Sequence, residues 1–308
     1  MEQGIVVKST GKRYTVLTSD GTIVSCTIKG KFRVKDIRTT NPVAVGDNVY
    51  FEIAGDESSA VITRLGKRRN YIIRKSSNLS REAQIIAANI DQAIIMVSLV
   101  NPETPVEFID RFLVTAEAYS VPAVIIFNKI DLHGQDDDDK LHYYKWLYEG
   151  IGYSTLSISV ENRINIESLH DLLRGKTSLL AGNSGVGKTS LLNLLNPALK
   201  LKTEEISHYH KQGKHTTTFP EMHKMPFGGS VIDTPGIRGF GVIDLEKGET
   251  YHFFPEIFRI AAACRFHNCL HINEPGCAVI SALETGAVTW SRYRSYLSIM
   301  ENDDSKYR

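Results

Sequence analysis

The stretch that decides the fold is Gly182-Asn183-Ser184-Gly185-Val186-Gly187-Lys188-Thr189. It matches the phosphate-loop pattern G-x-x-x-x-G-K-[ST] at every fixed position. That pattern requires a buried strand before it and a helix after it, which residues 178–181 and 190–195 predict. Glycines let the backbone wrap closely around phosphate groups, and the N–H groups at the helix start point at the anion. The predicted phosphate-binding residues are Gly182, Asn183, Ser184, Gly185, Val186, Gly187, Lys188, Thr189 and Ser190.

Two of these residues have more specific expected roles. Lys188 should reach the β- and γ-phosphates of a nucleotide, and the hydroxyl of Thr189 should bind Mg²⁺. We therefore count both residues, together with His215 (discussed below), among the candidate catalytic residues.

Composition places the chain among ordinary globular proteins. It has 308 residues, of which 42% are hydrophobic and 23% charged, and this length favours two or three domains. No apolar run is long enough to span a membrane. The first residues also lack the basic and apolar segments of a signal peptide, so we expect a cytoplasmic protein.

The net charge of +1 hides an asymmetry between the two parts of the chain. Residues 1–75 carry 14 Lys and Arg against 7 Asp and Glu, whereas the remainder carries 22 against 28. A basic N-terminal part on an acidic body suggests a polyanionic partner such as RNA. A solvated basic face without a partner is the alternative.

Short strands separated by turns fill residues 4–65. Five strands in so short a segment, with turns at residues 19–21 and 45–47, predict a small β-barrel of the OB type over residues 1–68, a fold that often binds RNA. Phe32 could stack on a base or simply pack. Basic residues surround it: Lys29, Lys31, Arg33, Lys35 and Arg38.

Strands and helices alternate through the middle of the chain. Continuous apolar runs such as residues 92–100 and 121–127 are typical of buried parallel strands. This alternation predicts an α/β domain over residues 69–240, with a parallel sheet covered by helices. Ligands of such sheets bind at the carboxyl ends of the strands, where the phosphate loop and the motifs below fall.

The strand at residues 124–127 is followed by Asn128-Lys129-Ile130-Asp131, which fits the N-K-x-D signature of GTPases. A carboxylate at Asp131 can accept hydrogen bonds from N1–H and N2–H₂ of guanine, a donor pair that adenine lacks. Ser159 and Val160 follow the next strand, where GTPases present a backbone N–H to guanine O6. We expect these residues to bind the guanine base of GTP.

Asp233-Thr234-Pro235-Gly236 follows a further strand and fits D-x-x-G. Asp233 should hold Mg²⁺ through water, and the N–H of Gly236 should contact the γ-phosphate. The polar segment 213–218 is typical of a mobile switch loop, in which Thr217 would complete the Mg²⁺ shell.

A cysteine-rich segment lies near the C-terminus. Cys264, Cys269, His271 and Cys277 follow the spacing C-x₄-C-x-H-x₅-C, which supplies a closed tetrahedral ligand set for one structural Zn²⁺ ion. His267 is a spare candidate ligand. We expect a small zinc-binding helical domain over residues 241–308 that the metal helps to stabilise.

The motifs occur in an unusual order, because N-K-x-D precedes the phosphate loop and D-x-x-G comes last. Circular permutation of this kind, an OB-like barrel before it and a Cys/His cluster after it closely resemble the ribosome small-subunit-dependent GTPase A family over essentially the whole chain. The resemblance implies GTP hydrolysis that is stimulated by the ribosome during late maturation of the small (30S) subunit, with contact to its rRNA. It also implies the zinc site.

Two positions bear on hydrolysis and on the last domain. Many GTPases place a water-positioning glutamine just after D-x-x-G, where this chain has Ile237. His215 matches a histidine of the family's G-x-H-T-T motif and is our candidate for that role, although it could equally pack or contact RNA. We expect a helix over residues 287–296, whose Arg292 and Arg294 either contact RNA or form a solvated face.

Three functions stay open on sequence alone. The first is an RNA-associated GTPase that acts as an assembly checkpoint, with the D-x-x-G switch setting the orientation of the last domain. The second is an RNA-binding placeholder that uses GTP as a structural ligand, which Ile237 allows. The third is a P-loop kinase with a zinc module, which Asn128 and Asp131 disfavour because it would prefer ATP. Nothing in the pattern suggests more than a monomer.

Overall fold

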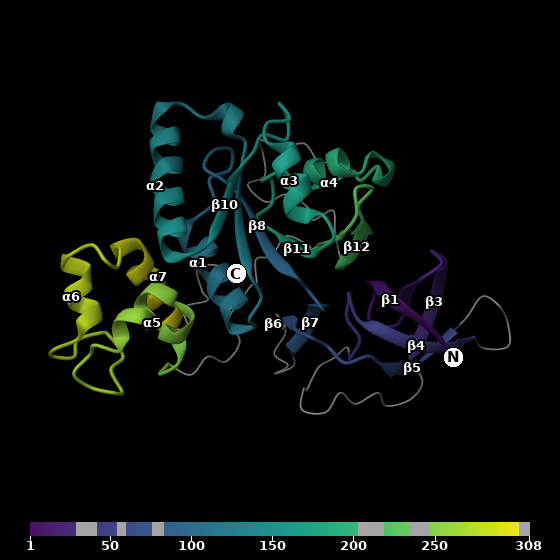
Figure 1. The fold of residues 1–308 in the computed structure, drawn as a ribbon, viewed down its shortest axis with the longest axis horizontal. Helices are drawn as coiled ribbons and strands as arrows, with labels where there is room; N and C mark the ends of the chain where they lie inside the picture. Colours follow the sequence, from purple (N-terminus) through teal and green to yellow (C-terminus); the bar gives the residue numbers. More distant parts are fainter. Residues whose placement is uncertain (29–41, 54–59, 76–82, 203–218, 235–246, 302–308) are drawn as a thin grey trace.

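We analysed a computed structural model, which describes residues 1–28, 42–53, 60–75, 83–202, 219–234 and 247–301. An 11-stranded sheet runs through the N-terminal and central parts in the order β10-β9-β8-β11-β13-β12-β1-β2-β3-β5-β4. The barrel and the C-terminal helices lie on opposite sides of the central domain (Figure 1). Among the helices in these ranges, none combines the length and apolar character needed to cross a lipid bilayer.

The N-terminal strands form the predicted five-stranded barrel. They are β1 (Glu2–Ser9), β2 (Tyr14–Thr18), β3 (Ile23–Ile28), β4 (Asn48–Ile53) and β5 (Ala60–Leu65). The barrel closes because β4 pairs with β1, while β3 and β5 pair in parallel. Side chains at alternate positions, such as Val6, Val16 and Phe51, fill its interior. Cys26 also belongs to this core.

The central sheet is parallel, as the alternating pattern predicted. Its parallel strands are β8 (Gln92–Ser98), β9 (Ala123–Asn128), β10 (Ser154–Ser157), β11 (Thr177–Ala181) and β13 (Ser230–Asp233). The strand β12 (Glu221–Lys224) was not predicted from sequence and runs antiparallel to β13.

Helices cover both faces of this sheet. Along β8, Ile95 and Val97 pack on one side with α1 (Val106–Ala118) and α2 (Gln135–Ile151). Ile94 and Met96 pack on the other side with α3 (Ile166–Leu173) and α4 (Lys188–Leu195). Burial on both faces explains why the strand is apolar at nearly every position.

A hairpin joins the barrel to the central sheet. Its strands, β6 (Tyr71–Lys75) and β7 (Ala83–Ala88), form a separate two-stranded sheet. Short helical turns fill other connections, namely η1 (Ile130–Leu132), η2 (Pro197–Leu199) and η3 (Thr250–Phe253). The acidic residues 136–138 lie in the first turn of α2, where negative charge favours a helix N-terminus.

The C-terminal part is helical and packs against α1. It contains α5 (Pro255–Ala261), α6 (Ala278–Glu284) and α7 (Trp290–Met300), of which α7 begins and ends a few residues later than expected. Phe254, Ile257 and Tyr296 form its core, and Val114 of α1 joins them. The C-terminal helices therefore share an apolar core with the central domain.

The structure overturns the expectation for Arg292. This side chain is fully buried, so it neither contacts RNA nor belongs to a solvated face. Its guanidinium donates from Nη1 to Oδ1 of Asp110 at 2.7 Å and from Nε to Oε1 of Glu256 at 2.7 Å. Asp110 is on α1 and Glu256 on α5, so both partners are distant in sequence. Arg294, by contrast, is exposed.

Candidate functional site

The glycine-rich loop joins β11 to α4, which is the strand–loop–helix context that the sequence predicted. Gly182 has φ +152°, and a Cβ there would lie 2.4 Å from the carbonyl oxygen of Met96. Gly187 caps α4 with φ +102°, and a Cβ there would lie 2.7 Å from Nδ2 of Asn128. Both positions need glycine, because any side chain would push the loop away from the sheet.

Opposite charges lie together at this loop. Lys188 donates from Nζ to the carbonyl oxygens of Gly182 at 2.6 Å and Asn183 at 3.0 Å. Burial lowers the pKa of Lys188, and the nearby Asp233 carboxylate opposes that shift. Asp233 is itself buried at the end of β13. The arrangement places one cation and one carboxylate beside a loop that is suited to an anion.

Asn128 connects the end of β9 to two other loops. Its Nδ2 donates to the carbonyl oxygen of Val186 at 2.8 Å, and its Oδ1 accepts from the backbone N–H of Val160 at 3.2 Å. Lys129, in the left-handed region with φ +67°, donates to the carbonyl oxygens of Gly185 at 2.7 Å and of Asn101. The loops that follow β9, β10 and β11 are therefore bound to one another.

The carboxylate of Asp131 is oriented by a neighbour. The hydroxyl of Ser159 donates to Oδ1 of Asp131 and accepts the backbone N–H of Asn162 at 2.9 Å. Ser159 is fully buried, so this hydrogen bond fixes one carboxylate oxygen. Asp131 is thereby held in one position beside the loop network.

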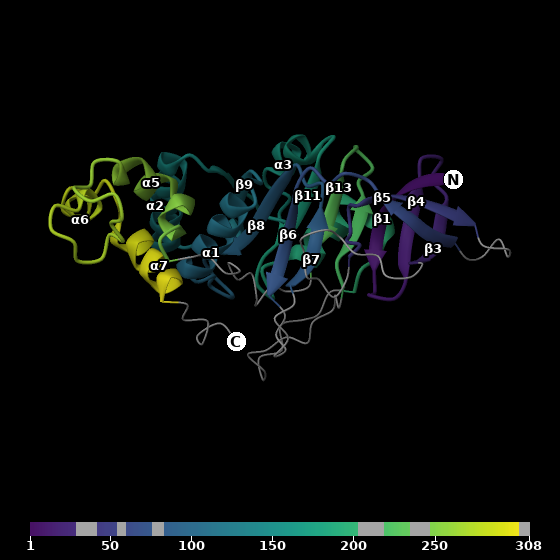
Figure 2. The same ribbon diagram turned by 90° about the horizontal axis from the view of Figure 1, so that it is seen from below.

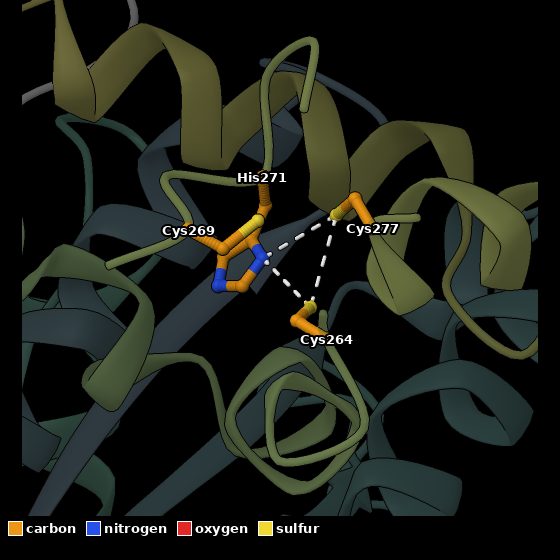
Figure 3. A group of neighbouring side chains, drawn as sticks. All are labelled: Cys264, Cys269, His271 and Cys277. Carbon is orange, nitrogen blue, oxygen red and sulfur yellow. Dashed lines mark hydrogen bonds between the residues drawn. The ribbon is translucent and has the colours of Figure 1, made fainter. Parts of the chain in front are cut away.

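The predicted metal ligands come together in the C-terminal part (Figure 3). One donor atom from each of Cys264, Cys269, His271 and Cys277 lies within 4.8 Å of all the others. Nδ1 of His271 is 3.5 Å from the sulfur atoms of both Cys264 and Cys277. His267 is exposed and lies outside the cluster. Three sulfur donors and one imidazole nitrogen, with only Cys264 partly exposed, fit a tetrahedral Zn²⁺ ion.

Hydrogen bonds from neighbouring residues hold the turn that carries His271. Glu274 accepts the backbone N–H groups of Leu270 and Ile272 at 2.7 and 2.8 Å. The hydroxyl of Tyr293 donates to the carbonyl oxygen of His271 at 2.6 Å. Such supporting contacts fix the orientation of a ligand, and His271 needs them because its φ of +56° is unusual for a side chain other than glycine.

Two family models match this chain and together cover its first two parts. The model described as the RsgA N-terminal domain matches residues 3–62, and that of the RsgA GTPase matches residues 65–243. The chain belongs to the RsgA GTPase family. It is accordingly a GTP hydrolase with a circularly permuted domain.

Relatives of this RsgA-family chain extend over its full length. Small ribosomal subunit biogenesis GTPase RsgA of Christiangramia forsetii is 50% identical, with 99% of this chain and 98% of the relative covered. The protein of that name from Bacteroides fragilis strain ATCC 25285 is also 50% identical, with 99% of each covered. YjeQ from Thermotoga maritima superposes with a TM-score of 0.77 at 35% identity, over 98% of both chains. YloQ, a circularly permuted GTPase, gives 0.72 at 30%, over 99% of this chain and 96% of the other.

Most of the sequence-predicted site residues of this RsgA-family chain meet at one sheet edge. These residues lie at the carboxyl ends of strands or follow them: Asn128, Lys129, Asp131, Ser159, Val160, residues 182–190 and Asp233. His215, Thr217 and Gly236 lie outside the residues that the structure describes. Thr234 was not predicted as a site residue; its hydroxyl donates to the carbonyl oxygen of Leu180 at 2.9 Å and connects the end of β13 to β11. Glu274 was not predicted either, although a carboxylate between two candidate metal ligands was a usable signal.

Metal analysis tests whether this cluster of the RsgA-family protein binds zinc. We expect one Zn²⁺ per purified chain, and we expect Cys277→Ser to lose most of it, because a tetrahedral site then keeps only three strong ligands. Cys26→Ser is the matched control, since Cys26 lies in the barrel core, and it should keep the metal. Equal zinc in both variants would contradict the assignment.

Proposed function

We propose that this chain binds GTP with Mg²⁺ at the carboxyl edge of its central sheet and hydrolyses it on the small ribosomal subunit during late maturation. The single observation that carries the proposal is the hydrogen-bonded link from Asn128 to Val186 and Val160. It joins a guanine-selective loop to a phosphate loop, which is the pairing that a GTP site requires. The names of the full-length relatives support the same small-subunit role.

Each loop takes one part of the nucleotide in this proposal. Asp131 accepts the donors of guanine, the backbone of Ser159 and Val160 faces its O6, and Lys129 packs beside the base. Residues 182–190 surround the phosphates, with Lys188 moving from the carbonyls of Gly182 and Asn183 to the phosphate oxygens. Burial lowers the pKa of Lys188. A bound phosphate would raise that pKa again and so favour the charged form of the side chain.

Mg²⁺ would be held by Thr189 and Asp233, with Thr217 and Gly236 proposed from sequence to complete the metal and γ-phosphate contacts. A buried carboxylate and a hydroxyl suit this hard cation. When bound with GTP, the ion neutralises charge that develops on the phosphates. Zn²⁺ in the C-terminal cluster has a separate, structural role.

The chain lacks the usual water-positioning glutamine. Ile237 follows D-x-x-G directly, and an aliphatic side chain cannot hydrogen-bond to water. We therefore expect slow hydrolysis by the free protein, with the ribosome supplying or ordering the missing group. His215 is the internal candidate for orienting water.

Changing His215 to alanine tests that assignment. GTP affinity should stay unchanged, whereas turnover stimulated by small subunits should fall about 10²-fold or more, because general acid–base and positioning groups contribute on this scale. His210→Ala is a suitable control from the same segment of sequence. Full stimulated turnover in the His215 variant would show that another group positions the water.

Contact with the subunit is proposed for the basic N-terminal part. Residues 1–75 carry an excess of seven positive charges, from 14 basic minus 7 acidic residues, and such a surface suits rRNA phosphates. We also propose that the chain divides into domains of residues 1–68, 69–240 and 241–308 and acts as a monomer in the cytoplasm. When small subunits are sedimented in the presence of a GTP analogue, the protein should co-sediment with them, and less of it should do so as the salt concentration rises. Absence of binding in every nucleotide state would contradict the proposal.

The second candidate function is an RNA-binding placeholder that keeps GTP as a structural ligand. Ile237 is the observation that favours it. The placeholder function predicts tight binding of GTP and of the subunit without stimulated hydrolysis. The GTPase proposal requires this binding together with stimulated hydrolysis.

A further inference from the structure

The barrel and the nucleotide domain share one continuous sheet, and the junction lies beside Asp233. Strand β1 of the barrel pairs with β12, where Lys8 is opposite Glu221. Strand β12 pairs in turn with β13, where Glu221 is opposite Asp233. Lys8, Glu221 and Asp233 therefore form one row across three strands, and Figure 2 shows the barrel strands continuing the line of the central sheet.

The two pairings in this row differ in extent. Between β12 and β13 the register covers every residue of β12, from Glu221 opposite Asp233 to Lys224 opposite Ser230. Between β1 and β12 it covers a single residue pair, which the Lys8 Nζ to Glu221 Oε2 ion pair of 2.7 Å reinforces. The barrel and the hairpin of β12 and β13 are therefore joined through one paired position.

A second contact holds the barrel elsewhere. Gly46, with φ +92°, approaches Ala88 so closely that a Cβ would lie 2.1 Å from the Ala88 carbonyl oxygen. The N–H of Ala88 donates to the carbonyl oxygen of Val45 at 2.8 Å, and Nδ2 of Asn89 donates to that of Gly46 at 2.9 Å. This backbone contact leaves little freedom for sliding. The β1–β12 contact, whose ion pair is partly exposed, is the weaker of the two.

We infer that Lys8 and Glu221 are positioning residues that couple the barrel to Asp233. This inference rests on the proposed function, in which Asp233 holds Mg²⁺ and the barrel contacts rRNA. The barrel then acts as a sensor of bound RNA. RNA bound to the barrel shifts β12, and β12 sets the position of the strand that ends in Asp233. Coupling of this kind is reciprocal, so a nucleotide bound at Asp233 also changes the stability of β1.

Amide hydrogen exchange tests the coupling without the ribosome. Guanosine 5′-(β,γ-imido)triphosphate, compared with GDP, should change exchange of residues 2–9 in the full chain by about 2–5-fold, the scale set by a partly exposed ion pair. Lys8→Glu and Glu221→Lys should each abolish the difference. The double variant, which exchanges the two charges, should restore it, whereas a merely structural ion pair would leave no difference between the two nucleotides to lose or to restore.

A matched control and a second assay separate this inference from the proposed function. Lys12→Glu makes the same charge change at an exposed barrel residue and should keep the nucleotide-dependent difference. Equal exchange of residues 2–9 in both nucleotide states of the unaltered protein, or no recovery in the double variant, would overturn the coupling. Turnover at saturating small subunits should fall about 2–5-fold in each single variant and recover in the double. Normal exchange coupling without any stimulation by subunits would instead refute the proposed function and leave the coupling standing.

Discussion

Replacing Asp131 with asparagine is expected to weaken binding of GTP and GDP by about 10⁴-fold, while xanthosine nucleotides gain affinity. A site built to hydrogen-bond a polar group rejects a ligand that leaves it unpaired by this margin. In the proposed site the carboxylate accepts both N1–H and N2–H₂ of guanine, whereas the amide N–H₂ of asparagine would face N2–H₂ donor to donor. Xanthine has a carbonyl at that position, which the amide can contact. Affinities for GDP and XDP, measured by displacement of a fluorescent nucleotide, check the switch.

The structure explains why Asp131 should show so clear a change. Its carboxylate is held by the hydroxyl of buried Ser159, so it cannot turn away to accommodate a mismatched base. Asp136→Asn provides the control, because Asp136 is exposed in the first turn of α2. Unaltered affinity for GDP in the Asp131 variant, or an equal loss of affinity for GDP and XDP, would contradict the base-recognition role.

Replacing Arg292 with methionine is expected to lower the free energy of unfolding by about 3–5 kcal/mol. Removal of one partner from a buried ion pair costs this much, because the remaining charges stay buried without compensation. Here the carboxylates of both Asp110 and Glu256 would lose their partner. Chemical denaturation followed by tryptophan fluorescence measures the change, with Arg294→Met as the control on the same helix. Arg294 is exposed and its loss should cost under about 0.5 kcal/mol.

The cost of losing Arg292 should also depend on pH. Burial, the largest cause, raises the pKa of the Asp110 carboxyl even while Arg292 opposes that shift. Without the guanidinium the pKa rises further, and a raised carboxyl pKa destabilises the fold at any pH above the unfolded value of about 3.9. The difference in the free energy of unfolding between the unaltered protein and the Arg292→Met variant should therefore shrink as pH falls from about 7 to about 5. If Arg292→Met lowered the free energy of unfolding no more than Arg294→Met does at every pH measured, the buried network would be contradicted.

Local sequence was enough to place the phosphate-loop motif and N-K-x-D at the ends of strands. The phosphate loop and N-K-x-D each combine a fixed motif with a strand before it, and parallel strands bring their carboxyl ends to one edge. The cluster of three cysteines and one histidine was also predictable, because the spacing of the four residues within residues 264–277 already indicates a common site. In these cases the information lies within a few neighbouring residues.

The burial of Arg292 could not be predicted from local sequence. An arginine on a helix is usually solvated, and its burial depends on Asp110 and Glu256, which are 182 and 36 residues away in the sequence. The strand β12 was missed for a similar reason. Its sequence, Glu221-Met222-His223-Lys224, lacks the apolar run of a buried strand, and it becomes a strand through pairing with β13 and β1.

The most direct test of the proposed function is GTP hydrolysis by the purified protein, alone and with purified small ribosomal subunits, with ATP as the control nucleotide. We predict slow basal hydrolysis of GTP, strong stimulation by small subunits, and no hydrolysis of ATP in either condition. Tight GTP binding with no stimulation at saturating subunits would contradict the ribosome-dependent GTPase and favour the placeholder. Hydrolysis of ATP at a rate similar to that of GTP would contradict the role of Asp131.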